Sequence, residues 1–129
     1  MDDFYFRQLR VYINSKELVK HVYGLLKKFP EEEKYALCNQ IRRAVTSILI
    51  NIAEGFGRFS SKEKTRFIEI SFGSLTETSC ELEISYELGY ITKEEYEEVE
   101  KQIIIISKQL SNLHKSVEQN YAKQNNPQD

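Results

Sequence analysis

The residue types best suited to catalysis are sparse in this chain, and their spacing fits no common active site. The histidines are His21 and His114. A di-iron centre in a helical bundle uses paired Glu-x-x-His motifs, but Glu17 stands four residues before His21, and no glutamate stands three residues before His114. The segment EGFGRFSSK lacks the spacing of a phosphate-binding loop. We therefore predict no catalytic residues, no cofactor and no metal site.

The two cysteines and the start of the chain bear on location. Cys38 and Cys80 lack the paired spacing of a metal site, and we expect small buried thiols in a reducing compartment rather than a disulfide. The first residues, MDDFYFRQLR, contain no apolar signal core. No stretch approaches the roughly 20 apolar residues of a membrane span. These features predict a cytoplasmic protein that does not contact a membrane.

Charge is distributed unevenly along the chain, although the net charge is only −2. Residues 35–70 are mainly basic, whereas residues 71–100 carry nine glutamates and a single lysine. Cations that contact phosphates give affinity without reading sequence. An alternative is that the same cations pair with the acidic half of a neighbouring copy, and the near-neutral net charge counts against strong binding. The candidate nucleic-acid-binding residues are Arg42, Arg58, Lys62, Lys64 and Arg66.

Helix boundaries are marked by proline, glycine and capping motifs. Phe29-Pro30 predicts the end of a first helix, and Gly55 ends a second. Capping boxes starting at Ser60 and Thr92 predict the beginnings of two more. The predicted helices span roughly residues 7–28, 31–54, 61–88 and 93–121, within a single domain of residues 1–121, and residues 122–129 form a polar tail that we expect to be disordered.

Apolar residues in these segments recur at helical spacing and define a core. Short connections require antiparallel neighbours, so the predicted fold class is all-α, an up-down-up-down antiparallel four-helix bundle. The clearest seam is on the fourth helix, where steps of three and four join Tyr96, Val99, Ile103, Ile106, Leu110, Leu113 and Val117. On the third helix, the residues expected to face the core are Phe67, Ile70, Ser74, Leu75, Leu82 and Leu88.

Beside its core stripe, the second helix carries a line of polar residues that includes Gln40, Arg43, Asn51 and Glu54. Its far side carries the apolar residues Ile50 and Ala53. A helix that is apolar on more than one face usually buries more than one face, and Ile104 and Ile105 on the fourth helix also lie outside the core seam. We infer an oligomer interface, in which Arg43 or Arg58 pairs with Glu54 or Glu77. Alternatives are a monomer with scattered surface isoleucines, or a ligand site along the polar line. The interface candidates are Gln40, Arg43, Ile50, Asn51, Ala53, Glu54, Glu77, Ile104 and Ile105.

One long segment resembles a known family. It reads FPEEEKYALCNQIRRAVTSILINIAEGFGRFSSKEKTRFIEISFGSLTET and is followed by ELEISYELGYI. This pattern is similar to the four-helix-bundle proteins encoded in 23S rRNA intervening sequences, whose relatives include the accessory variability determinant of diversity-generating retroelements. The chain departs from the family pattern at Leu49-Ile50, where Pro-Ala is common, and at Ser71-Phe72, where a small residue is more usual before Gly73.

The resemblance implies a homopentameric ring, and no enzymatic activity is established for the family. For the retroelement relatives it also implies a basic surface that binds nucleic acid and a reverse transcriptase partner. Our functional expectation is a non-enzymatic oligomeric accessory protein that binds structured RNA or DNA weakly and without sequence preference. The alternative is a protein-interaction scaffold with no role in nucleic-acid binding.

Overall fold

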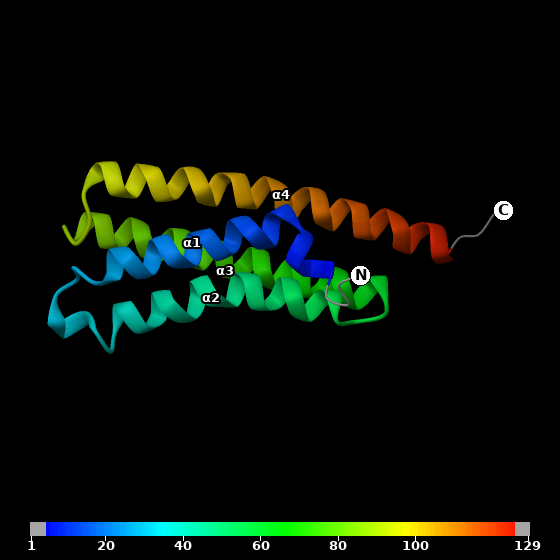
Figure 1. Cartoon of the computed structure of the whole chain (residues 1–129), viewed down its shortest axis with the longest axis horizontal. Coiled ribbons are helices and arrows are strands. Elements are labelled where there is room, and N and C mark those ends of the chain that lie inside the picture. Colours follow the sequence, from blue (N-terminus) through cyan, green and yellow to red (C-terminus); the bar gives the residue numbers. More distant parts are fainter. Residues whose placement is uncertain (1–4, 126–129) are drawn as a thin grey trace.

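The chain folds into four long helices, which confirms the predicted all-α four-helix bundle. The computed structural model describes residues 5–125, with side chains placed as far as Asn120. The α-helices are α1 (Arg10–Leu26), α2 (Leu37–Phe56), α3 (Ser61–Glu87) and α4 (Lys93–Asn125). Short 3-10 turns, η1 (Tyr5–Gln8) and η2 (Glu31–Glu33), precede α1 and α2. Figure 1 shows the four helices lying side by side along one long axis.

The helices are antiparallel and form a square. Across α1 and α4, Asn14 donates to Gln109 and Lys28 pairs with Glu95, so numbers rise along one helix as they fall along the other. Within residues 5–125, α1 contacts α2 and α4, and α3 contacts the same two helices. Among the described residues, the backbones of the diagonal pairs, α1 with α3 and α2 with α4, stay more than 8 Å apart between Cα atoms. This is the up-down-up-down arrangement that short connections require.

The core is formed by one apolar stripe from each helix. The predicted seam of α4 is confirmed, because five of its residues are buried and Tyr96 and Leu113 are partly buried against the core. On α3, Phe67, Ser74, Leu75 and Leu82 are buried as expected, but Ile70 and Leu88 are 39% and 52% exposed. The largest fully buried side chains are Leu18, Val22, Ile41, Val45, Ile48, Ile52, Ile68, Leu75, Leu82, Val99, Ile106 and Leu110.

The face that α3 turns toward α2 is lined by small polar residues instead. Ser71 is fully buried and donates to the Ile48 carbonyl of α2 at 2.7 Å. Thr78 and Ser85 are also fully buried, and each donates to the carbonyl four residues earlier in α3. Short side chains let the two backbones approach closely, while these internal bonds satisfy the buried hydroxyl groups. Hydrophobic spacing alone misses such a face.

The helix ends agree with the sequence where a local motif sets them. The Ser60 hydroxyl accepts from the Glu63 N–H at 3.1 Å, and Thr92 and Glu95 form a reciprocal capping box. Gly89 has φ of +82°, a left-handed conformation that favours glycine. The prediction for the end of the fourth helix is corrected, because α4 runs to Asn125 and includes the first residues of the expected tail. Residues 126–129 lie outside the described part of the chain.

The second α-helix begins at Leu37 rather than at residue 31. The phenolic hydroxyl group of Tyr90 donates to Glu33 Oε2 at 2.8 Å, and the other oxygen of that carboxylate accepts from the Leu37 N–H at 3.4 Å. Glu33 therefore bridges the α3–α4 connection and the first turn of α2. This tertiary bond holds the three glutamates in η2 instead of in the helix.

The two cysteines differ in their environments. Cys38 is buried, and burial raises the pKa of its thiol. Cys80 is exposed on α3, so the prediction of a buried residue is wrong for this position. Both thiols are free. Among residues 5–125, no helix combines the length and the hydropathy needed to cross a bilayer.

Candidate nucleic-acid interface and assembly surfaces

Four of the five predicted nucleic-acid-binding residues meet where α2 turns into α3. We call this region, residues 54–67, the α2–α3 corner. α2 ends at Phe56 and is capped by Gly57, whose N–H donates to the carbonyls of Ala53 and Glu54, each at 3.1 Å. Ser60 then caps α3. Because only Arg58 and Phe59 separate these caps, Arg58, Lys62, Lys64 and Arg66 are brought to one end of the bundle.

Two of these cations pair locally with carboxylates. Arg58 bonds Glu54 at 2.8 Å and Arg66 bonds Glu63 at 3.1 Å, all four side chains being largely exposed. Exposed pairs one helical turn apart contribute little stability, so a phosphate can compete for the guanidinium groups. The corner holds four cations against two carboxylates and is net positive.

The ring of Phe67 orders both arginines. The guanidinium carbon of Arg58 lies 4.9 Å from the ring centroid, and that of Arg66 lies 4.6 Å from it. These are cation–π distances. Since Phe67 is itself buried, it anchors two charged groups that would otherwise sample many rotamers. Partial ordering before binding reduces the entropy that a ligand must remove.

The two lysines of the corner differ. The Lys64 ammonium group donates to the Arg58 carbonyl oxygen and lies 5.6 Å from the Phe56 ring centroid. Burial lowers the pKa of this amine. Lys64 therefore stabilises the turn, and its side chain is only partly exposed. Lys62 is exposed, and within residues 5–125 it forms no ion pair.

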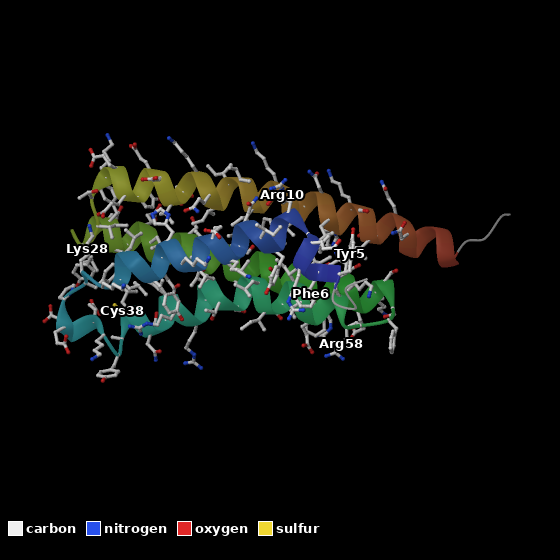
Figure 2. All side chains as sticks on the ribbon, viewed as in Figure 1. Tyr5, Phe6, Arg10, Lys28, Cys38 and Arg58 are labelled. Carbon is white, nitrogen blue, oxygen red and sulfur yellow. The ribbon has the colours of Figure 1, made fainter. Side chains whose placement is uncertain are left out.

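Arg42 does not belong to this cluster. It lies 16 residues before Arg58, a separation of roughly 24 Å at the helical rise. Its guanidinium group makes a long contact of 3.5 Å with the Lys34 carbonyl oxygen, near the start of α2. Figure 2 shows Cys38, one turn before Arg42, and Arg58 near opposite ends of the bundle. The structure therefore separates Arg42 from the other four candidates.

Acidic residues limit the positive surface of the α2–α3 corner on the side that faces α4. A surface groove of about 440 Å³ is lined by Lys62, Glu63, Thr65, Arg66, Glu69 and Glu118. Three carboxylates there oppose two cations, so a polyanion gains nothing on this side. The accessible positive side is the turn itself, around Arg58 and Lys62.

The amide in the apolar part of α2 is satisfied within one chain. Asn51 Nδ2 donates to the Ser47 carbonyl and to the Ser47 hydroxyl oxygen, each at 2.8 Å. The Ser47 hydroxyl lies 2.8 Å from that of Ser74 on α3. Asn51 is half-buried. Its two donors thus need no acceptor from a second protomer.

The other polar candidates for an interface lie on the surface. Gln40, Arg43, Glu54 and Glu77 are exposed. Glu54 pairs with Arg58 of the same chain. Within the described residues, Arg43 forms no ion pair with Glu54 or with Glu77. These side chains are accessible to a partner, and the structure does not join them into one network.

The predicted second apolar surface is exposed but is not continuous. Ile50, Ile104 and Ile105 are 56%, 47% and 51% exposed. Ile50 lies on α2 and the other two on α4, which is diagonally opposite α2 across the bundle. The structure therefore places the three isoleucines on separate surfaces, with Ala53 half-buried beside Ile50 on α2.

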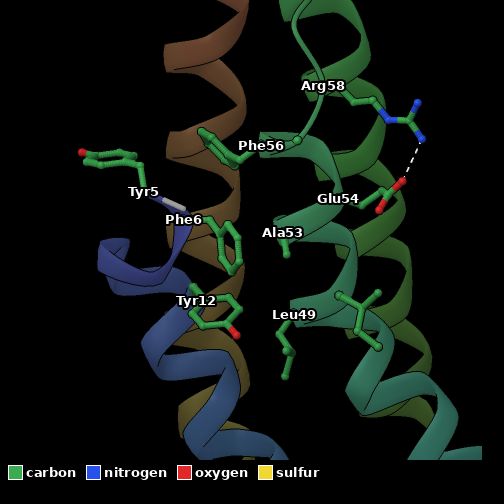
Figure 3. A pocket seen from close by; sticks show the side chains of 10 residues that line it. Tyr5, Phe6, Tyr12, Leu49, Ala53, Glu54, Phe56 and Arg58 are labelled. Atoms are coloured by element: carbon green, nitrogen blue, oxygen red, sulfur yellow. Dashed lines mark hydrogen bonds and ion pairs between the residues drawn. The ribbon is translucent and has the colours of Figure 1, made fainter. Parts of the chain in front are cut away.

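Ile50 borders a groove of about 640 Å³ between η1 and α2. Phe6, Tyr12 and Phe56 lie close together in its lining, which also includes the ion pair of Glu54 and Arg58 (Figure 3). The lining is mostly apolar and aromatic.

The two histidines join helices. His21 Nδ1 bonds Gln102 on α4, and His114 Nε2 lies 2.8 Å from Glu69 on α3. Within the described part of the chain, no group of three or more His, Cys, Asp or Glu side chains could hold a metal ion.

Sequence reasoning missed a buried carboxyl on α3. Glu81 is only 8% exposed, and within the described residues its Oε1 accepts no hydrogen bond. Burial, together with the carboxylate of Glu77 one turn earlier, raises the pKa of Glu81 to about 7. The sequence signal was its place at helical spacing with Ser74, Thr78 and Ser85, the face that packs on α2.

Two exposed aromatic residues were also missed. Phe59, in the turn of the α2–α3 corner, is fully exposed, and Tyr35, before α2, is 84% exposed. Both lie outside the helical stripes that periodicity detects. An aromatic residue inside a short turn between capping motifs is the signal that could have identified Phe59.

Comparison with known proteins places the chain in a family. No curated protein matches it. A similar structure is the crystal structure of a protein of unknown function from the S23 ribosomal protein family of Bacteroides thetaiotaomicron. Its sequence is 30% identical to that of this chain, and the two structures superpose with a TM-score of 0.75. The match covers 81% of this chain and 95% of that one. The model of the 23S rRNA-intervening sequence protein family matches residues 7–112. The chain therefore belongs to the 23S rRNA-intervening sequence protein family.

Proposed function

We propose that this protein is a non-enzymatic accessory protein that binds nucleic acid weakly and without sequence preference, through the α2–α3 corner. The observation that carries the proposal is the gathering of Arg58, Lys62, Lys64 and Arg66 in one short region that contains only two carboxylates. Phosphate contacts from such cations give affinity that depends on charge and not on base sequence. The family's link to 23S rRNA supports RNA as the first ligand to test.

We further propose that the protein acts as a homo-oligomer, with a pentamer as the expected state. Ile50 on α2 and Ile104 and Ile105 on α4 are exposed on separate surfaces, as the two contact faces of a protomer in a ring would be, and the groove beside Ile50 offers apolar area for a neighbouring chain. A ring would repeat the corner around its edge, and several weak contacts acting together raise the overall affinity. Light scattering should give the mass of five chains of 15.2 kDa. A monomer mass would contradict the assembly.

The nucleic-acid proposal is tested by charge reversal. Arg58→Glu, Lys62→Glu and Arg66→Glu together should abolish binding of a structured RNA and leave the oligomer mass unchanged. A control with the same change of charge is Lys20→Glu, Lys27→Glu and Lys101→Glu, all at exposed positions outside the corner. Gel-shift titrations at two salt concentrations should show wild-type affinity falling by about 0.7 to 0.9 log units per log unit of salt for each phosphate neutralised.

A protein-interaction scaffold is the second candidate. Its support is the row of exposed glutamates at the other end of the bundle, on α3 and α4: Glu83, Glu87, Glu94, Glu97 and Glu98. Such a surface suits a basic protein partner, of which the implied reverse transcriptase would be one. Absence of RNA binding at low salt, or equal binding by both triple variants, would favour this function.

A further inference from the structure

The tip of the α2–α3 corner presents an aromatic ring to solvent. Phe59 is the most exposed large hydrophobic side chain of the described residues, and none of these residues covers it. Single exposed apolar residues are common on proteins. Phe59 differs from such residues because it stands directly after Arg58 and three residues before Lys62, two exposed cations of the corner.

The backbone on both sides of Phe59 is fixed by hydrogen bonds. The Arg58 N–H donates to the Gly55 carbonyl at 3.1 Å, and the Arg58 carbonyl accepts from the Lys64 ammonium group. On the other side, the Ser60 carbonyl accepts from the Lys64 N–H at 3.1 Å, and its hydroxyl accepts from Glu63. The turn thus holds Phe59 outward without a contact to the ring itself. A preorganised group loses little conformational entropy when it binds.

An exposed aromatic face between cations matches the chemistry of an unpaired nucleobase with its flanking phosphates. Proteins that bind single strands combine a positive track for the backbone with aromatic rings on which bases stack. Stacking tolerates any sequence because every base has a π-face, whereas bases inside a duplex are already stacked on each other.

We propose that Phe59 stacks on an unpaired base of a bound RNA while Arg58 and Lys62 contact the adjacent phosphates. This proposal rests on the proposed function and names the feature of the RNA that the corner selects. The protein should therefore prefer single-stranded or looped segments to a perfect duplex. A second copy of the chain covering the ring is the competing explanation for an apolar group at this position, and the test separates the two.

The first experiment uses tryptophan fluorescence, because the chain contains no tryptophan. Phe59→Trp places a single reporter at the tip, and Tyr35→Trp places one at the other strongly exposed aromatic position, 84% exposed and outside the corner. A single-stranded RNA of about 15 nucleotides, the size that one binding module covers, should quench the first reporter and leave the second unchanged. The matching duplex should quench neither to the same extent.

The second experiment compares affinities at one salt concentration. Phe59→Leu keeps an apolar side chain that cannot stack, and should weaken single-strand binding roughly ten-fold, within the range expected for loss of one stacked base. Phe59→Trp should bind at least as well as wild type. Because no charge changes, the salt slope should be the same in all three proteins, whereas the triple charge reversal should abolish binding.

The outcomes distinguish a failure of the stacking proposal from a failure of the proposed nucleic-acid-binding function. Equal affinity of the Phe59→Leu variant and wild type, or equal binding of single strand and duplex, overturns the stacking role while RNA binding itself stands. No RNA binding by the wild-type protein at low salt removes the proposed function as well. A change in oligomer mass in the Phe59→Leu variant assigns the ring to a protein interface and also overturns the proposal.

Discussion

The hydroxyl oxygens of Ser47 on α2 and Ser74 on α3 lie 2.8 Å apart, across the seam between the two helices. Asn51 extends the contact by donating to the Ser47 hydroxyl oxygen, and Ser71 donates across the same seam to the Ile48 carbonyl. Hydrogen bonds with fixed geometry thus align two helices whose contacts elsewhere are apolar and less directional. This seam explains why polar residues interrupt the most apolar part of α2.

The Ser47–Ser74 bond should be measurable as a coupling between two substitutions. Ser74→Ala is expected to lower the free energy of unfolding by about 1 kcal/mol, the usual net value of an intramolecular hydrogen bond. In a double-mutant cycle with Ser47→Ala, chemical denaturation should show a coupling of at least about 0.5 kcal/mol. Ser116→Ala, at an exposed position of α4, serves as the control. Strictly additive effects would show that the two hydroxyl groups do not interact in solution.

The closest approach at the α2–α3 corner involves Gly55. A Cβ atom added there would lie 3.0 Å from Phe67 Cβ and 3.4 Å from the Lys64 carbonyl oxygen. Since Gly55 is buried within α2 and Phe67 is buried on α3, neither side chain nor backbone can move freely. Gly55→Ala should therefore lower the free energy of unfolding by roughly 1–3 kcal/mol, the usual cost of overpacking, in thermal or denaturant unfolding.

Gly73, in the middle of α3, provides the matched comparison. A Cβ atom at this position meets nothing within 4 Å. Alanine is favoured over glycine in a helix interior by about 1 kcal/mol, so Gly73→Ala should raise the free energy of unfolding. If Gly55→Ala were equally stabilising, the close packing of α2 on α3 would be wrong. If Gly73→Ala stabilised the monomer but changed the oligomer mass, the exposed glycine would mark a contact between protomers.

Features set by local sequence were predictable. The seam of α4 follows from one unbroken pattern of apolar residues, and the starts of α3 and α4 follow from capping motifs that span only four residues. The start of α2 was not predictable, because it depends on the bond between Glu33 and Tyr90, which stand 57 residues apart. No local pattern contains such a contact.

The candidate site was predictable only in part. The cations after Gly57 are close in sequence and are therefore close in space, but Arg42 is separated from them by the length of α2. Residue numbers alone do not show how far the rise along a helix separates two cations. The exposure of Phe59 and the burial of Glu81 depend on which faces of α2 and α3 meet. That choice is made by the small hydroxyl residues of α3, to which hydrophobic periodicity gives no weight.

Stability should depend on pH through Glu81, whose folded-state pKa of about 7 exceeds its ordinary value of 4.5. Between those values the unfolded chain ionises this carboxyl while the folded chain keeps its proton. The free energy of unfolding therefore falls as pH rises through this window, by an upper bound of roughly 3 kcal/mol. Below pH 4.5 and above the folded-state pKa, this group does not change the free energy of unfolding further with pH.

Glu81→Gln carries an uncharged amide, so thermal unfolding should show that the variant is more stable than wild type at pH 8 and nearly equal to it at pH 4.5. The control Glu83→Gln changes an exposed carboxylate and should retain the wild-type slope. A pH dependence that survives in the Glu81→Gln protein would assign the slope to another group.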